Sequence, residues 1–160
     1  MPIKIIQANY NNPQHGRHII ELLDCYAHDP MGGNEALPDF VAQNLVYELS
    51  NRKDAFSILA YVEGQPAGLV NCFEGFSTFV CRPLINIHDV IVATEFRGMN
   101  LSTKMLRMVE EIAKERECCK LTLEVLEKNY IAINSYRKFG FKHYQLDPVL
   151  GKAEFWEKKL

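Results

Sequence analysis

Residues 87–102, with the sequence IHDVIVATEFRGMNLS, hold the pattern that decides the fold. The stretch begins as an apolar strand and passes through Arg97 and Gly98 into a segment with helical spacing. A helix that begins there presents free backbone N–H groups and the positive end of its dipole beside a guanidinium group. This combination favours a phosphorylated ligand.

The residues after this turn have a strong helical pattern. Apolar side chains recur every three to four positions from Leu101 to Ile112, and charged side chains fill the positions between them. This spacing predicts an amphipathic helix. Before the turn, residues 85–92 predict the central strand of a sheet.

Working outward, the sequence predicts a mixed α/β fold, in which about four helices flank a twisted, mostly antiparallel sheet of six to seven strands. The expected strands are residues 3–8, 55–62, 67–73, 85–92, 121–125, 141–144 and 153–158. The other expected helices begin at Pro13, near Pro38 and at Tyr130, and Gly140 ends the last of them. Residues 63–66 predict a turn, and residues 74–81 either prolong the strand before them or form a loop.

The composition indicates one globular domain spanning residues 1–160. Of the 160 residues, 48% are hydrophobic and 24% are charged, which are ordinary values for a folded chain. The formal net charge of −2 gives no reason to expect a nucleic-acid partner, which would need a basic face. No apolar run approaches the roughly 18 residues of a membrane span, so we expect no membrane partner.

Neither the N-terminus nor the cysteines indicate export. Residues 1–10 lack the basic and apolar regions of a signal peptide. The five cysteines are odd in number and form no Cys-x-x-Cys pair, which favours a reduced, cytoplasmic protein without zinc or disulfides. The histidines also lack metal-ligand spacing, so we expect no metal.

A second motif covers residues 127–141, EKNYIAINSYRKFGF. Together with residues 97–102, RGMNLS, it resembles the GNAT family of N-acetyltransferases. The family's second motif, Asn-x-x-Ala-x-x-x-Tyr-x-x-x-Gly-Phe, is met here at every marked position. The first motif usually reads Arg/Gln-x-x-Gly-x-Gly/Ala, and in this chain Asn100 replaces its first marked glycine and Ser102 is its last small residue.

The resemblance covers nearly the whole chain and implies acetyl-CoA (coenzyme A) as the co-substrate. The residues that it implies for the pyrophosphate are Arg97, Gly98, Met99, Asn100, Leu101, Ser102 and Thr103. The pantetheine arm would follow the main chain of Val90, Ile91 and Val92, at a splayed sheet edge, and would bond Asn129. Glycine at position 98 lets the backbone approach closely. Asparagine is the residue other than glycine that best tolerates a left-handed backbone, so the turn can survive at position 100.

The same resemblance implies direct transfer of the acetyl group to a primary amine, with Tyr136 pointing its hydroxyl at the thioester sulfur to assist the departing thiolate. An alkyl amine is mostly protonated at neutral pH and needs a base. His88 and Asp89 are the candidates, and an imidazole suits this role. Asp89 alternatively binds a substrate ammonium. We expect only one of the two to face the acyl group, because successive strand residues point to opposite faces.

The expected acceptor is a small-molecule amine, either an alkyl amine or a polyamine. This follows because residues 75–79 and the pair His88-Asp89 resemble the diamine acetyltransferase subgroup. A protein amino group or an amino-acid-like compound stays open as the alternative. Phe76 and Phe79 either line an acceptor pocket with Glu74 and Tyr26 or cover the sheet, and the second interpretation is preferred. The habit of the family implies a homodimer.

Two other functions compete with this interpretation. A GNAT module that binds coenzyme A without catalysis and regulates a partner is favoured by Asn100, whereas Asn129 and Tyr136 argue against it. A nucleotide-binding α/β protein would share the Arg-Gly turn, but the sequence lacks both Gly-x-x-x-x-Gly-Lys-Ser/Thr and Gly-x-Gly-x-x-Gly.

Overall fold

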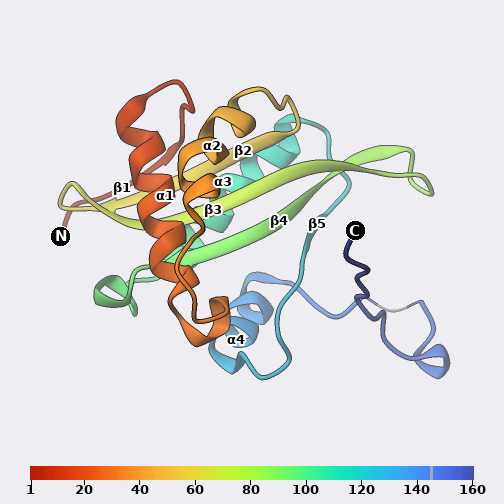
Figure 1. Cartoon of the computed structure of the whole chain (residues 1–160). Coiled ribbons are helices and arrows are strands. Elements are labelled where there is room, and N and C mark those ends of the chain that lie inside the picture. The colour runs from red at the N-terminus through yellow and green to blue at the C-terminus, as the bar shows by residue number, and fades with distance from the viewer. Residues whose placement is uncertain (145) are drawn as a thin grey trace. The chain divides into compact units, whose positions relative to one another are not determined.

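A five-stranded sheet with helices packed on it forms the first of two compact units, Met1–Leu126 and Glu127–Leu160 (Figure 1). The computed structural model describes residues 1–144 and 146–160. The strands are β1 (Ile3–Gln7), β2 (Ala55–Val62), β3 (Gln65–Ser77), β4 (Arg82–Val92) and β5 (Leu121–Leu123). The α-helices of this unit are α1 (Pro13–Ala27), α2 (Asp39–Ser50) and α3 (Leu101–Glu115). The expectation of a single domain over residues 1–160 stays a prediction.

The sheet has the order β1-β2-β3-β4-β5. Neighbouring strands are antiparallel except β4 and β5, which are parallel. The predicted mixed α/β fold with a mostly antiparallel sheet is therefore confirmed. Two details differ in the described residues, where the sheet has five strands instead of six to seven, and β3 rather than the strand over 85–92 lies at its centre.

The hairpin between β2 and β3 turns where the sequence predicts it. Glu63 and Gly64 both have positive φ, at 50° and 80°, and Val62 pairs directly with Gln65. Two positive φ angles are what a two-residue type I′ turn requires, and its twist matches that of the flanking strands. Residues 74–81 divide between the two possibilities, because β3 continues to Ser77 and residues 78–81 then form the turn into β4.

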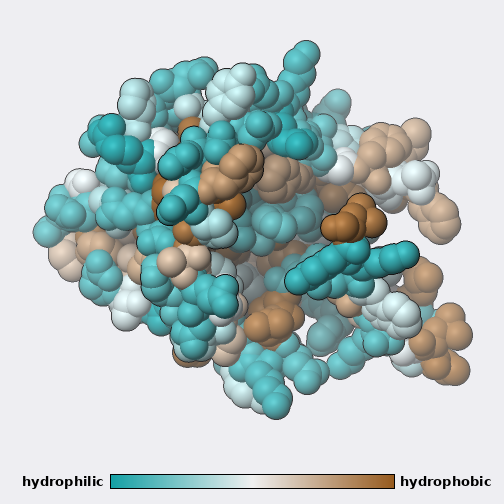
Figure 2. All heavy atoms as spheres, viewed as in Figure 1, coloured by the Kyte–Doolittle hydropathy of each residue, from teal (hydrophilic) through white to brown (hydrophobic). Residues whose placement is uncertain are grey.

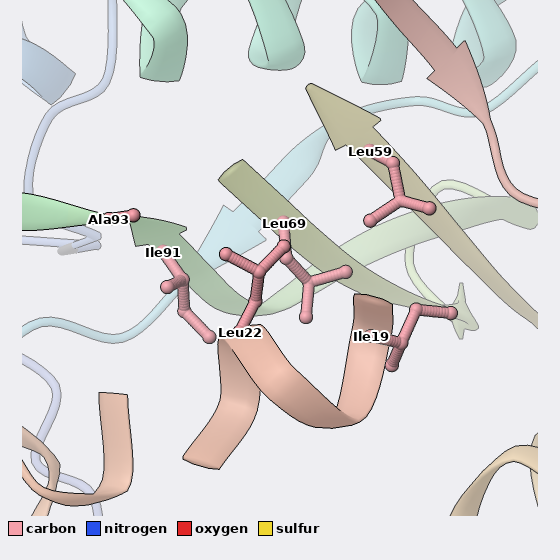
Figure 3. Packing of buried hydrophobic residues seen from close by; sticks show 6 residues of the cluster. All are labelled: Ile19, Leu22, Leu59, Leu69, Ile91 and Ala93. Atoms are coloured by element: carbon pink, nitrogen blue, oxygen red, sulfur yellow. The ribbon is translucent and has the colours of Figure 1, made fainter. Parts of the chain in front are cut away.

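Helices α1 and α3 pack on opposite faces of the sheet. Leu69 of β3 belongs to a buried cluster with α1, whereas a Cβ on its neighbour Gly68 would lie 2.7 Å from the methyl of Met105 in α3. Successive strand residues point to opposite faces, so the two helices must cover different sides. The buried residues of the cluster on the α1 side are Ile19, Leu22, Leu59, Leu69, Ile91 and Ala93 (Figure 3). Each buried leucine or isoleucine contributes about 1.5–3 kcal/mol.

The second unit contains α4 (Tyr130–Phe139) and a short 3-10 helix, Pro148–Leu150. Gly140 has φ of 117° and ends α4 as predicted, since its N–H bonds the carbonyls of Arg137 and Tyr136. The prediction of strands over 141–144 and 153–158 is wrong, because neither segment forms a ladder. Both segments are rich in aromatic residues, but a strand needs a partner as well as a propensity.

Candidate active site

A β-bulge on β4 organises the region around His88 and Asp89. Cys72 of β3 pairs with Ile87, and the preceding residue Asn71 pairs with Asp89, so His88 has no partner on β3. An extra residue of this kind bends the strand and re-aims the side chains around it. The strong hydrophobic pairing on either side fixes the bulge in place.

The bulge brings both candidate bases to the same face of the sheet. Asp89 accepts a hydrogen bond from Asn71, with 3.0 Å between Asn71 Nδ2 and Asp89 Oδ2. The exposed ring of His88 lies edge-on to Phe73, with 5.7 Å between the ring centroids. Phe73 is two residues beyond Asn71 on β3 and therefore on its face. The expectation that only one of the pair would face this side is wrong, because the extra residue interrupts the alternation.

A row of polar side chains crosses the sheet from Asp89. Asn71 lies next to Asp89 on β3, and Ser57 lies next to Asn71 on β2. Ser57 Oγ donates to Asn71 Oδ1 at 2.6 Å, and the Tyr10 hydroxyl lies 2.7 Å from Ser57 Oγ. Ser57 and Asn71 are the buried polar residues of the described chain, and the side chain of Asn71 is only 4% exposed. The four side chains form one continuous hydrogen-bonded chain.

Tyr26 of α1 faces the carboxylate end of this row. Its pKa is raised above the ordinary value, first by burial and then by the negative charges of Asp89 and Asp29. A phenol that stays protonated beside two carboxylates is a hydrogen-bond donor. Glu74 belongs with Tyr26 to the pocket that the sequence leaves open as the alternative, but here it accepts a bond from Arg116 at 3.3 Å, beyond the end of α3. That partner places Glu74 on the opposite face of the sheet from α1, so no such pocket forms in the described residues.

The aromatic residues near the β3–β4 turn do not cover the sheet. Phe76 is 59% exposed and Phe79 is 98% exposed. Brown side chains at this projecting hairpin are visible in Figure 2. The preferred interpretation of these two residues as a cover for the sheet is therefore wrong, because β3 and β4 run past the helices before they turn (Figure 1).

The outer edge of β4 becomes unpaired at the bulge. Strand β5 pairs with β4 only from Ile85 to Ile87, where Ile87 meets Leu123. In the part of the chain that the structure describes, no strand pairs with this edge along Val90, Ile91 and Val92. The Ile91 side chain is buried in the cluster under α1, so what this stretch offers a ligand is its main chain.

The turn between β4 and α3 has two left-handed residues. Gly98 has φ of 84°, and Asn100 has φ of 60° and ψ of 26°. Asn100 thus adopts the backbone conformation that the sequence allows for it. A Cβ on Gly98 would meet no described atom within 4 Å, so within the protein the positive φ accounts for this glycine. The close approach of its backbone to a ligand stays a prediction.

Helix α3 begins without a side-chain cap. The Asn100 side chain accepts no hydrogen bond from the first turn of α3, and the first bond along the helix runs from Lys104 N to Asn100 O at 3.1 Å. The amides of Leu101 and Thr103 lie ahead of this bond and have no acceptor within the helix. Met99 and Thr103 are half-buried and Ser102 is too, whereas the buried Leu101 side chain belongs to the core.

Arg97 already has an acidic partner. Its Nη2 lies 3.4 Å from Asp29 Oδ2, and its Nε donates to the Val92 carbonyl at 3.5 Å. The arginine side chain is 57% exposed, so a ligand can reach it. Asp29 was missed by the sequence reasoning, since it lies 68 positions away and belongs to the loop after α1.

In the second unit, Asn129 caps α4 and Tyr136 lies within it. Asn129 precedes the helix, and its Oδ1 accepts a bond from Ala132 N at 3.4 Å. Tyr136 is half-buried, and its ring lies edge-on to Phe141 with 5.9 Å between centroids. The side-chain oxygen of Asn129 therefore caps the first turn of α4, in addition to any role toward a ligand.

Tyr10, Ser57 and Asn71 were also missed. For Ser57 and Asn71, the available signal was a polar residue within an apolar run of a strand, Ala55–Val62 in β2 and residues 67–73 in β3. Among the described residues, no three His, Cys, Asp or Glu side chains are grouped so that they could hold a metal ion. Nor does any described helix have the length and apolar character needed to cross a membrane.

The sequence matches the model of the acetyltransferase (GNAT) family over residues 18–141. It is 30% identical over 100 residues to the thialysine N-epsilon-acetyltransferase of Sus scrofa, covering 58% of this chain and 54% of that protein. The chain thus spans about half the length of the curated relatives it matches.

Solved structures with low sequence identity share the fold. An aminoglycoside acetyltransferase from an uncultured soil metagenomic sample, in complex with trehalose, superposes with a TM-score of 0.78 at 17% identity, covering 99% of this chain and 97% of that one. An aminoglycoside N-acetyltransferase in complex with CoA has a TM-score of 0.75 at 16% identity, covering 99% and 96%. With the family match over 18–141, the chain belongs to the GNAT family, and the predicted resemblance is confirmed.

Proposed function

We propose that the protein is an N-acetyltransferase that moves the acetyl group of acetyl-CoA to the primary amine of a small alkyl amine or polyamine. The observation that carries the proposal is the unpaired outer edge of β4, which a connection of eight residues, 93–100, joins to the uncapped start of α3. Unpaired main-chain groups bind an extended arm as another strand would, and an uncapped helix start binds phosphate. Acetyl-CoA carries both an extended arm and a pyrophosphate.

The residues proposed to hold acetyl-CoA fit its chemistry. The main chain of Val90–Val92 aligns the arm, and the turn from Arg97 to Thr103 binds the pyrophosphate. Gly98 and Asn100 support this role, because their left-handed conformations direct the chain into α3 without a side-chain cap. Arg97 supplies a positive charge to the pyrophosphate, either by breaking its ion pair with Asp29 or by contacting both groups at once. Asn129 is proposed to bond the arm on the strength of its motif.

The proposed reaction is direct transfer in a ternary complex. The amine nitrogen forms a bond to the acetyl carbon, and the bond from that carbon to sulfur breaks. His88 or Asp89 takes the proton that the amine loses, and Tyr136 gives a proton or a hydrogen bond to the departing thiolate. Alignment and fixed dipoles contribute most of the rate gain, because each can supply several kcal/mol.

The relatives support a second class of acceptor. The name of the matched Sus scrofa protein, thialysine N-epsilon-acetyltransferase, points to the side-chain amine of an amino-acid-like compound. Acidic groups near Tyr26 suit either acceptor, since both carry an ammonium group before transfer. The resemblance to the family also supports a homodimer, which sedimentation of the purified chain would test. The number and spacing of the cysteines support a cytoplasmic location.

The test is an acetylation assay with acetyl-CoA and a panel of diamines, polyamines, lysine analogues and peptides, read by thiol release. We expect turnover with at least one small amine. No thiol release above the uncatalysed background with any amine, while coenzyme A still binds, would favour a binding module without catalysis.

Replacing Tyr136 by phenylalanine tests the chemical step. General acid assistance contributes about 100-fold or more, so turnover should fall by about that factor. The Michaelis constant for acetyl-CoA should change little, because the ring stays in place. Equal turnover in the two proteins would remove Tyr136 from the mechanism.

A further inference from the structure

We propose that Tyr10, Ser57 and Asn71 are positioning residues, which hold the carboxylate of Asp89 toward the acceptor amine. This inference rests on the proposed function, and it selects Asp89 rather than His88 as the group that meets the amine. The juxtaposition that carries it is the hydrogen-bonded row that runs from Tyr10 across β2 and β3 to Asp89.

Every hydrogen bond in the row points toward Asp89. The carboxylate can only accept, so the Asn71 amide nitrogen donates to it, and the Asn71 carbonyl is left to accept from Ser57. The single Ser57 proton is thereby used. Tyr10 must then donate to Ser57 Oγ. Aligned bonds polarise one another, so the negative charge of Asp89 is stabilised by all three residues.

Burying this row of polar side chains contributes less to the stability of the core than apolar side chains would. Ser57 is fully buried and Asn71 nearly so, in strands whose other inward side chains are apolar. Burying a polar group is unfavourable unless it is hydrogen-bonded, and even then an apolar side chain of the same shape serves as well. The row instead ends on a half-buried carboxylate at the bulge, which is the position a substrate group can reach.

The arrangement orients the carboxylate and does not conduct a proton. An amide cannot pass a proton along without changing its tautomer, so Asn71 interrupts any relay. It holds Asp89 Oδ2 and leaves Oδ1 for another donor. His88 has no comparable support, since its ring is exposed and rests on Phe73.

The test compares two tyrosines that lie on the same side of the sheet. Tyr10→Phe removes the hydroxyl at the start of the row. Tyr61→Phe is the matched control, because the Tyr61 hydroxyl bonds His18 at 2.8 Å and lies outside the row. We expect Tyr10→Phe to lower kcat about three- to tenfold, as loss of one charge-linked hydrogen bond does, with the KM for acetyl-CoA unchanged. Tyr61→Phe should keep wild-type kcat.

Asp89→Asn separates this inference from the proposed function. If Asp89→Asn keeps full turnover, the proposed role of Asp89 fails. If Asp89→Asn lowers turnover and Tyr10→Phe behaves like Tyr61→Phe, only the positioning role fails. We expect Tyr10→Phe to have no further effect in the Asp89→Asn background. An equal reduction in both backgrounds would mean that Tyr10 acts on stability instead.

A spectroscopic measurement tests the row without turnover. The carboxyl carbon of Asp89, observed by ¹³C NMR, should change its chemical shift in Tyr10→Phe and in Asn71→Leu, but not in Tyr61→Phe. An unchanged carboxyl resonance in folded Tyr10→Phe protein would overturn the inference.

Discussion

Two helices of the same length, α1 and α3, both begin at an asparagine and use it in opposite ways. Asn12 has an extended backbone, and its side chain accepts from the amides of Gln14 and His15 at 2.9 and 3.3 Å. Asn100 is left-handed, and its side chain caps nothing in α3. Asn12 therefore uses its side chain to stabilise a helix. Asn100 uses its backbone to turn the chain and leaves the amides of Leu101 and Thr103 for an outside acceptor.

The largest expected effect comes from breaking the left-handed turn. A β-branched residue is strained in this conformation, so Asn100→Val should weaken acetyl-CoA binding about tenfold, which corresponds to roughly 1–2 kcal/mol of strain. Asn100→Gly is the matched control and should bind at least as tightly as the wild type. Calorimetric titration of both variants checks this, and equal affinities for Val and Gly would contradict the role of the turn.

The next largest effect is a loss of stability when α1 loses its side-chain cap. Asn12→Ala should lower the free energy of unfolding by about 1 kcal/mol, because the two amides lose their acceptor. Urea denaturation measures the loss. The exposed neighbour Asn11 provides the control, since Asn11→Ala removes no cap. The contrast between the helices breaks down if Asn12→Ala weakens acetyl-CoA binding as much as it lowers stability.

The smallest effect concerns the charge beside α3. Asp29→Asn keeps the acceptor that Met31 N uses but removes the negative partner of Arg97. Exposed ion pairs contribute about 0.2–1 kcal/mol, so acetyl-CoA should bind up to about fivefold tighter at low salt. The gain should shrink at high ionic strength because salt screens the pair.

A second exposed ion pair provides the control for Asp29→Asn. Glu110→Gln removes the partner of Lys114 on the same helix, where the two charges lie 2.8 Å apart. That variant should leave acetyl-CoA affinity unchanged. A similar gain in both variants would show that overall charge, and not Arg97, controls binding.

The sequence predicts well what depends on nearby residues. The apolar run of β2 with the turn after it, the spacing of α3 and the glycine after α4 each reflect an interaction within one turn or one hairpin, and the predicted bounds agree closely with the structure. The left-handed backbone of Asn100 could also be anticipated, because few other residues adopt it easily.

What the sequence does not reveal depends on register between distant strands. The bulge at His88 exists only because β3 and β4 pair as they do, and it changes the face on which His88 lies. The row from Tyr10 to Asp89 requires two such registers at once, Ser57 opposite Asn71 and Asn71 opposite Asp89. The aromatic segments 141–144 and 153–158 have strand propensity, but propensity alone provides no pairing partner.

The central claim is that the uncapped start of α3 binds the pyrophosphate of coenzyme A. The most direct measurement is an ¹⁵N NMR titration of the protein with coenzyme A and, separately, with pantetheine, which lacks the pyrophosphate. We expect coenzyme A, but not pantetheine, to cause large shifts at the amides of Gly98, Leu101 and Thr103. The capped amides of Gln14 and His15 should stay unchanged with both ligands. Binding of coenzyme A that leaves the amides of Gly98, Leu101 and Thr103 unmoved would contradict it.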